Sequence, residues 1–150
     1  MNNDEKYMSI AIEWAKKAEK LDEVPVGAVI VWQNKIIGKA CNLRESKRNP
    51  LAHAEILAIG QAARKIGGWR LSGCTIYVTL EPCPMCAGAI INARIDDVVF
   101  GAYDPKAGAF GSLYDLADGR LNHTPIVKGG VLQDECAAVI KEYFKGKRKG

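Results

Sequence analysis

Thr75-Ile76-Tyr77-Val78-Thr79-Leu80-Glu81-Pro82-Cys83-Pro84-Met85-Cys86 is the stretch that decides the fold. Its first five residues are almost all apolar or β-branched, which predicts a strand that is covered on both faces. Two prolines follow, and proline is tolerated in the first turn of a helix because its nitrogen needs no partner there. The stretch therefore predicts a buried strand leading into a helix, with two cysteines at the helix entry.

The spacing of these cysteines predicts a metal site. Cys83 and Cys86 are three residues apart, so both sulfur atoms lie on one face of the first helical turn. A helix N-terminus favours negative charge and hence the thiolate form that binds metal. Leu51-Ala52-His53-Ala54-Glu55 predicts a second helix entry, which supplies His53. Three protein ligands with a fourth position for water are typical of catalytic zinc, so we expect one Zn²⁺ per subunit.

Glu55 follows His53 by two residues. In mid-helix this spacing would point the two side chains apart, but the first residue of a helix entry still has loop geometry. Glu55 can then reach a water activated by zinc without binding the metal, which predicts a general acid and base. Zinc lowers the pKa of such a water from about 15.7 to roughly 7, so a nucleophile is available at neutral pH.

Other interpretations of the two motifs stay open. His-Ala-Glu alone occurs by chance on many amphipathic helices, and Pro-Cys-x-x-Cys alone also suits half of a structural zinc site or a redox pair. A structural site would need a fourth Cys or His at short spacing. His123 is the only other histidine, and the remaining cysteines, which we interpret as small buried hydrophobes, are scattered singly: Cys41, Cys74 and Cys136.

Length and composition predict one domain over residues 1–150, large enough for a real core. Hydrophobic residues make up 48% and charged residues 25%, which are ordinary globular values. Five cysteines without framework spacing favour a reducing compartment. The polar N-terminus and the lack of a long apolar run predict no signal peptide and no membrane span, so we expect a cytoplasmic protein. A net charge of +4 permits nucleic-acid binding without establishing it.

Apolar periodicity and turn residues predict the remaining elements. Helices are expected over residues 4–21, with Asp4 as the cap, and over 53–67, 84–92 and 133–145. Strands are expected over 28–32 and 35–40, joined by a Gln33-Asn34 turn, over 97–102, and within 125–131. Residues 104–112 predict a glycine-rich loop at the edge of the site, followed by a helical turn at 113–116. This alternation predicts an α/β fold in which both metal-binding helices begin beside strand ends, where such sheets hold ligands.

Several motifs carry a resemblance to a known family. His-x-Glu followed by Pro-Cys-x-x-Cys is the known pattern of zinc-dependent base deaminases. Three stretches are more specific: Val24-Pro25-Val26-Gly27-Ala28, Cys86-Ala87-Gly88-Ala89 and Asn122-His123. With these motifs, the chain resembles the bacterial tRNA adenosine deaminases of the cytidine-deaminase-like superfamily over nearly its whole length.

The resemblance implies a three-layer α/β sandwich, with a five-stranded mixed sheet and helices on both faces, and a homodimer. It implies a hydrolase that acts on the C–N bond of a cyclic amidine and converts adenosine to inosine at the wobble position of a tRNA anticodon. Asn42 would hold the target nucleotide. The expected base pocket comprises Pro25, Val26, Ala54 and Leu80. Asp104 could contact the substrate or merely start a turn.

The anticodon stem-loop is the partner that the resemblance implies. The terminal helix would meet it through Tyr143 and Phe144, where the family more often has two phenylalanines. Expected phosphate contacts are the basic residues of one loop and of the tail: Arg44, Lys47, Arg48, Lys145, Lys147 and Arg148. Two rivals remain, a deaminase of a free base or nucleoside and a non-catalytic RNA-binding module with a structural zinc. Glu55 argues against the second, because a structural site has no need of it.

Overall fold

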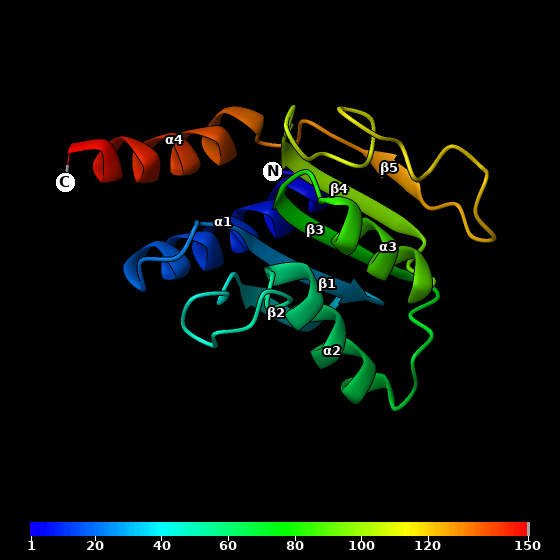
Figure 1. The fold of residues 1–150 in the computed structure, drawn as a ribbon. Helices are drawn as coiled ribbons and strands as arrows, with labels where there is room; N and C mark the ends of the chain where they lie inside the picture. The colour runs from blue at the N-terminus through cyan, green and yellow to red at the C-terminus, as the bar shows by residue number, and fades with distance from the viewer. Residues whose placement is uncertain (150) are drawn as a thin grey trace.

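The computed structural model describes residues 1–149, and the side chains of residues 1–147. Within this range the elements are, in order, α1 (Asn3–Lys20), β1 (Gly27–Trp32), β2 (Lys35–Cys41), α2 (Ala54–Ile66), β3 (Cys74–Leu80), α3 (Pro84–Asn92), β4 (Asp97–Ala102), β5 (Ile126–Lys128) and α4 (Gln133–Lys149) (Figure 1). The predicted helices and strands are confirmed in type and order. The predicted helical turn at 113–116 is wrong, because this segment turns back to form an isolated β-bridge between Phe110 and Asp115.

The strands form one five-stranded mixed sheet in the order β2-β1-β3-β4-β5. β1 is antiparallel to β2 and to β3, whereas β3, β4 and β5 are parallel to one another. Gln33 and Asn34 turn the chain between β1 and β2 with φ values of 50° and 62°. Positive φ at both central residues is the hairpin geometry that matches the twist of the flanking strands.

Both faces of the sheet are covered, as predicted. Successive side chains of β1 point to opposite faces. Ala28 and Ile30 pack in the core that contains α2 and α3, whereas Val29 and Val31 pack in the core that contains α1 and Cys136 of α4. The fold is therefore the three-layer α/β sandwich that the resemblance implied. The C-terminal end of α4 projects beyond the sheet (Figure 1).

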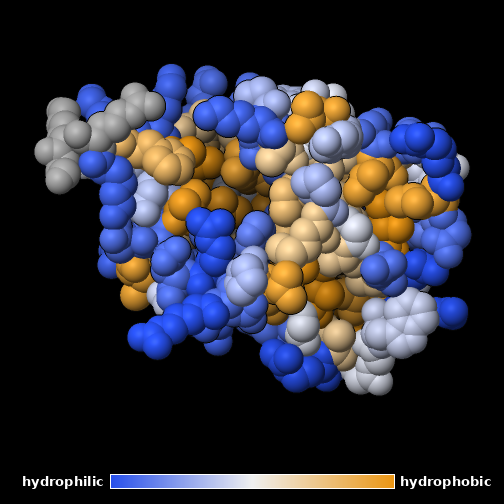
Figure 2. Space-filling model, in the orientation of Figure 1, coloured by the Kyte–Doolittle hydropathy of each residue, from blue (hydrophilic) through white to orange (hydrophobic). Residues whose placement is uncertain are grey.

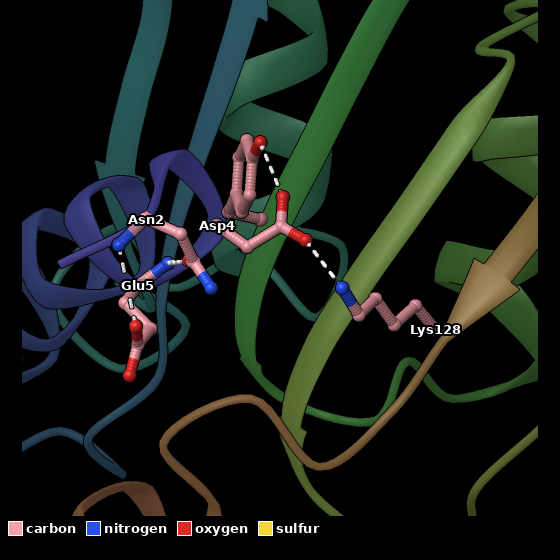
Figure 3. A network of polar contacts seen from close by, with 5 residues as sticks. Asn2, Asp4, Glu5 and Lys128 are labelled. Atoms are coloured by element: carbon pink, nitrogen blue, oxygen red, sulfur yellow. Dashed lines mark hydrogen bonds and ion pairs between the residues drawn. The ribbon is translucent and has the colours of Figure 1, made fainter.

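The cap of α1 differs from the prediction. Asn2, not Asp4, caps this helix, through a capping box in which Asn2 and Glu5 each accept the other's backbone N–H (Figure 3). Asp4 lies one residue inside the helix and points to the sheet, where it accepts hydrogen bonds from Tyr77 Oη at 3.0 Å and Lys128 Nζ at 2.8 Å. Asp4 therefore joins α1 to β3 and to the segment that forms β5.

α2 and α3 begin at the same edge of the sheet. β2 and β3 run in the same direction, because each is antiparallel to β1, so the chain leaves both strands at one edge. His53 is the N-cap residue of α2 and Cys83 that of α3, and neither side chain caps its own helix. Because neither side chain is used for capping, the two can approach each other at this edge. In residues 1–149 no helix has the length and apolar character needed to cross a membrane.

Candidate active site

The three predicted metal ligands lie together at the entries of α2 and α3. His53 Nδ1 lies 3.5 Å from Cys86 Sγ and 3.8 Å from Cys83 Sγ. Zinc bonds of about 2.3 Å to sulfur and about 2.0–2.1 Å to nitrogen, at tetrahedral angles, would separate such ligand atoms by about 3.5–3.8 Å. The donor set and its spacing therefore fit Zn²⁺.

The number of ligands favours catalytic over structural zinc. In the part of the chain that the structure describes, the metal-ligating cluster contains His53, Cys83 and Cys86, with ligand atoms within 4.8 Å of one another. His123 does not join it, since its Nε2 lies 2.7 Å from the carbonyl oxygen of Ile95. Structural zinc takes four protein ligands, whereas a catalytic site keeps one position open.

The two sulfur atoms differ in acidity when no metal is bound. A hydrogen bond from the Cys86 thiol, with a further one from His53, lowers the pKa of Cys83 to about 4. The pKa of Cys86 is raised, because its thiol donates to Cys83 and is buried. The pair thus holds one proton at neutral pH. Metal binding needs both thiolates and releases that proton.

Glu55 lies in the first turn of α2, beside the ligands, and the residue is 4% exposed. Burial raises the pKa of its carboxyl to about 7. A carboxyl whose pKa lies near the working pH can both accept and donate a proton, as a general acid and base must.

A cavity of about 200 Å³ opens over Glu55 and over two of the ligands, His53 and Cys83. Predicted substrate residues that line it are Val26, Asn42, Ala54, Leu80 and Asp104. Arg44, which the sequence predicted as a phosphate contact, also lies at this cavity. The structure therefore places most of the predicted pocket, from five separate segments, around the predicted metal site.

Asn42 is held in one orientation at the cavity wall. Its side-chain nitrogen donates to the carbonyl oxygen of Val24 at 3.2 Å, and its side-chain oxygen accepts the backbone N–H of Arg44 at 3.2 Å. Asp104 lies at the cavity wall and starts a turn. Its carboxylate accepts the N–H groups of Lys106 and Ala107.

Comparisons with known proteins agree with this site. A sequence-family model described as MafB19-like deaminase matches residues 2–148. A tRNA-specific adenosine deaminase of Bacillus subtilis is 51% identical over 150 residues, which cover 99% of this chain and 93% of that one. A second, from Haemophilus influenzae, is 49% identical over 97% of this chain and 86% of that one. The chain belongs to the family of the tRNA-specific adenosine deaminases. The resemblance that its motifs indicated is thereby confirmed.

Solved structures place this deaminase in the same fold. One, from work on A-to-I editing by tRNA:A34 deaminases at the wobble position of transfer RNA, superposes with a TM-score of 0.86 at 40% identity. The superposition covers 89% of this chain and 98% of the solved chain. A guanine deaminase from Nitrosomonas europaea has a TM-score of 0.83 at 24% identity, over 95% of this chain and 85% of that one, and shows the shared fold alone.

Some predicted residues of the deaminase lie away from the cavity. Pro25 is buried and does not line it. Because alternate residues of an extended segment point to opposite sides, Val24 and Val26 face the cavity and Pro25 faces away. Phe144 lines a neighbouring groove of about 430 Å³. Tyr143 donates its hydroxyl to the carbonyl oxygen of Asp22 at 3.2 Å.

The basic residues predicted to contact phosphates are spread over two segments. Lys47 and Arg48 are exposed in the loop after β2, and Lys145 is exposed on α4. Lys147 pairs with Asp22 at 2.5 Å. The side chain of Arg148 lies outside the described part of the deaminase.

Two buried carboxylates escaped the sequence analysis. Glu23 accepts the backbone N–H groups of Glu45 and Ser46, at 3.0 and 2.6 Å, and the Ser46 hydroxyl at 2.7 Å. Glu81 lines the cavity and receives hydrogen bonds from the 104–112 loop. In each case the sequence signal was a glutamate close to a proline in an otherwise apolar stretch. Such a glutamate is a candidate for burial, and a buried carboxylate must find hydrogen-bond donors.

Proposed function

We propose that this chain is a zinc-dependent hydrolase that deaminates adenosine to inosine at the wobble position of a tRNA anticodon. The observation that carries the proposal is the meeting of a three-ligand metal cluster with buried Glu55 under one cavity. This arrangement occurs in a chain that is 51% identical to a tRNA-specific adenosine deaminase. A structural zinc module would need neither Glu55 nor a cavity beside the metal.

His53, Cys83 and Cys86 would hold one Zn²⁺ per subunit. When bound at such a site, zinc activates a water molecule as the nucleophile. Glu55 would accept a proton from the attacking water and return it to ring nitrogen N1 of adenine as the C6–O bond forms. A second proton moves through Glu55 to the departing amine, which leaves as ammonia. The products are inosine and ammonia, and Glu55 ends in its starting state.

The cavity holds the base while the rest of the substrate stays outside. Its volume of about 200 Å³ is below the roughly 300–1,000 Å³ of pockets that enclose a drug-sized ligand. Val26, Ala54 and Leu80 supply apolar walls, and Asn42 offers a fixed amide to the nucleotide. The target base must be unstacked to enter, which costs least in a single-stranded loop.

The surface next to the cavity suits a longer RNA. The neighbouring groove is bordered by Ala137, Ile140 and Phe144 of α4 and shares Leu80 with the cavity. Figure 2 shows apolar surface below α4 on this side of the molecule. Flanking bases can stack on such a surface for about 1–3 kcal/mol each. Arg44, Lys47, Arg48 and Lys145 would contribute phosphate contacts.

The finer features of the proposal follow the resemblance. We infer a homodimer, supported by the small apolar residues Gly88 and Ala89 on α3, which are only half-buried in one copy. Sedimentation at micromolar concentration should give the mass of two chains, and a monomer would contradict this. A cytoplasmic location is supported by five cysteines that are all free, as a reducing compartment would keep them. We treat residues 1–150 as one deaminase domain.

The deciding experiment incubates the purified zinc-loaded protein with tRNA and with an anticodon stem-loop that carries adenosine at the wobble position. Sequencing should show inosine, which pairs as guanosine, at that position alone. Free adenosine, guanine and cytosine, incubated in parallel, should stay unchanged. Turnover of a free base or nucleoside as efficient as that of the stem-loop would replace the RNA assignment with the nucleoside deaminase.

A further inference from the structure

Glu81 is a buried carboxylate between the end of β3 and the metal-binding entry of α3. It is 2% exposed, and Cys83 follows two residues later. In the described part of the chain no cation pairs with it, since the ion pairs there join other residues. A carboxylate in such a place must be satisfied by hydrogen bonds, or its burial costs several kcal/mol.

Four donors from the 104–112 loop converge on Glu81. Its Oε1 accepts the N–H of Asp104 at 3.1 Å, and its Oε2 accepts the N–H groups of Phe110 and Ser112, each at 3.1 Å. The Ser112 hydroxyl also donates to Oε1. An ionised carboxylate has about four acceptor sites, so these donors use its full capacity. Glu81 therefore has no free acceptor site with which to bind a donor group of the substrate.

Close packing keeps the loop against this carboxylate. A Cβ atom at Gly108 would lie 2.3 Å from Glu81 Cδ and 2.5 Å from the carbonyl oxygen of Asp104. Position 108 therefore requires glycine, because any larger side chain would collide with Glu81 and with the backbone of Asp104. The loop is also tied to the entry of α3, since Ala109 donates its N–H to the carbonyl oxygen of Pro82 at 2.9 Å.

The same loop supplies one side of the cavity rim through Asp104 and Ala107. We propose that Glu81 is a positioning residue that fixes this rim for the target nucleotide, separately from the metal and from the proton transfers of Glu55. The inference rests on the proposed deamination. A rim held by one buried carboxylate is pre-organised, so binding does not have to order it.

Glu81→Gln tests the inference, because the side chain keeps its shape but turns one acceptor oxygen into a donor. Two loop donors then face an N–H group, and the loop should loosen. In the zinc-loaded protein without RNA, amide hydrogen exchange of Phe110 and Ser112 should become about tenfold faster. Zinc content should equal that of the parent. KM for the anticodon stem-loop should rise about tenfold, with kcat within about threefold.

Ser112→Ala is the milder variant, because it removes one donor and keeps the carboxylate, and it should shift exchange and KM in the same direction by less. If Glu81→Gln fails to fold, Ser112→Ala decides. Glu135→Gln, which changes an exposed carboxylate on α4, is the matched control and should change neither quantity.

Unchanged exchange in a folded Glu81→Gln protein, or a fall in kcat at constant KM, would overturn the inference. A parent protein inactive on every substrate would instead refute the proposed function, with the exchange result still reporting on the loop.

Discussion

Lys147 on α4 pairs with Asp22, with 2.5 Å between Nζ and a carboxylate oxygen. The side chains are 50% and 70% exposed, so the pair contributes little to stability. We expect the pair to affect RNA binding instead, because Lys147 is one of the cations that the sequence predicted to contact phosphate. The Asp22 carboxylate already pairs with this cation, so a phosphate group must compete with Asp22 for it.

Asp22→Asn should therefore strengthen RNA binding. Asparagine tolerates the left-handed φ of 60° at this position, so the backbone is not strained. Affinity for the anticodon stem-loop should rise, and the slope of log K against log salt should steepen by up to about 1, the effect of one added phosphate contact. Titrations between about 50 and about 200 mM salt measure both quantities.

Lys147→Ala is the matched control for this experiment. It should weaken binding and flatten the salt dependence, and Asp22→Asn combined with Lys147→Ala should behave like Lys147→Ala alone. If Asp22→Asn weakened binding as much as Lys147→Ala does, the pair would be holding α4 in its binding position, not masking a cation.

Cys86→Ala should abolish zinc binding. Cys86 is fully buried and supplies one of the three ligands, so two ligands remain. Elemental analysis should find little zinc in the purified variant, and its melting temperature should fall, because a metal that binds only the folded state stabilises it. Cys74→Ala, also a fully buried cysteine but outside the cluster, should keep its zinc. Equal zinc in Cys86→Ala and parent would rule out the assigned ligands.

Glu55→Gln should separate metal binding from chemistry. Glutamine fills the same space but cannot accept and return a proton, so turnover of the stem-loop should fall by about 10²–10⁴-fold. Zinc content and melting temperature should stay close to those of the parent. Single-turnover assays on zinc-loaded protein measure the loss. Near-normal turnover would contradict the role given to Glu55.

The sequence predicted well what depends on local chemistry. Two helix entries were recognisable from Pro82, Pro84 and the ligand spacing, and the nearly continuous apolar and β-branched residues of 75–79 predicted a strand buried on both faces. His53 and Cys83 could be brought together from the sequence because each begins a helix that was expected beside a strand end, where such sheets hold ligands. Correctly predicted helices and strands were therefore enough to infer that the two residues meet.

Long-range hydrogen bonds between polar side chains were not predictable in this way. Asp4 suited a helix cap by its position, but its partners Tyr77 and Lys128 lie 73 and 124 residues away. Glu81 receives donors from a loop up to 31 residues further along. No spacing rule links such pairs, because the fold alone decides which loop passes a given carboxylate. Pro25 lies outside the cavity lining for a local reason, since the side of the extended segment that it faces could not be fixed without the neighbouring elements.

Glu23 should make stability depend on pH through the loop that carries Asn42 and Arg44. Burial acts to raise the pKa of Glu23, but hydrogen bonds from the Ser46 hydroxyl and from the backbone N–H groups of Glu45 and Ser46 hold it below its ordinary 4.5. The folded state therefore binds this proton less tightly than the unfolded state. The stabilisation is present above about pH 4.5 and is lost as the pH falls further.

Glu23→Gln should lower the free energy of unfolding by about 2 kcal/mol at neutral pH, and the difference from the parent should shrink in acid. Denaturant titrations across this range measure it, with Glu45→Gln, an exposed carboxylate of the same loop, as the control that keeps the parent's pH dependence. A constant difference between Glu23→Gln and parent down to about pH 3 would show that the charge of Glu23 does not hold the loop.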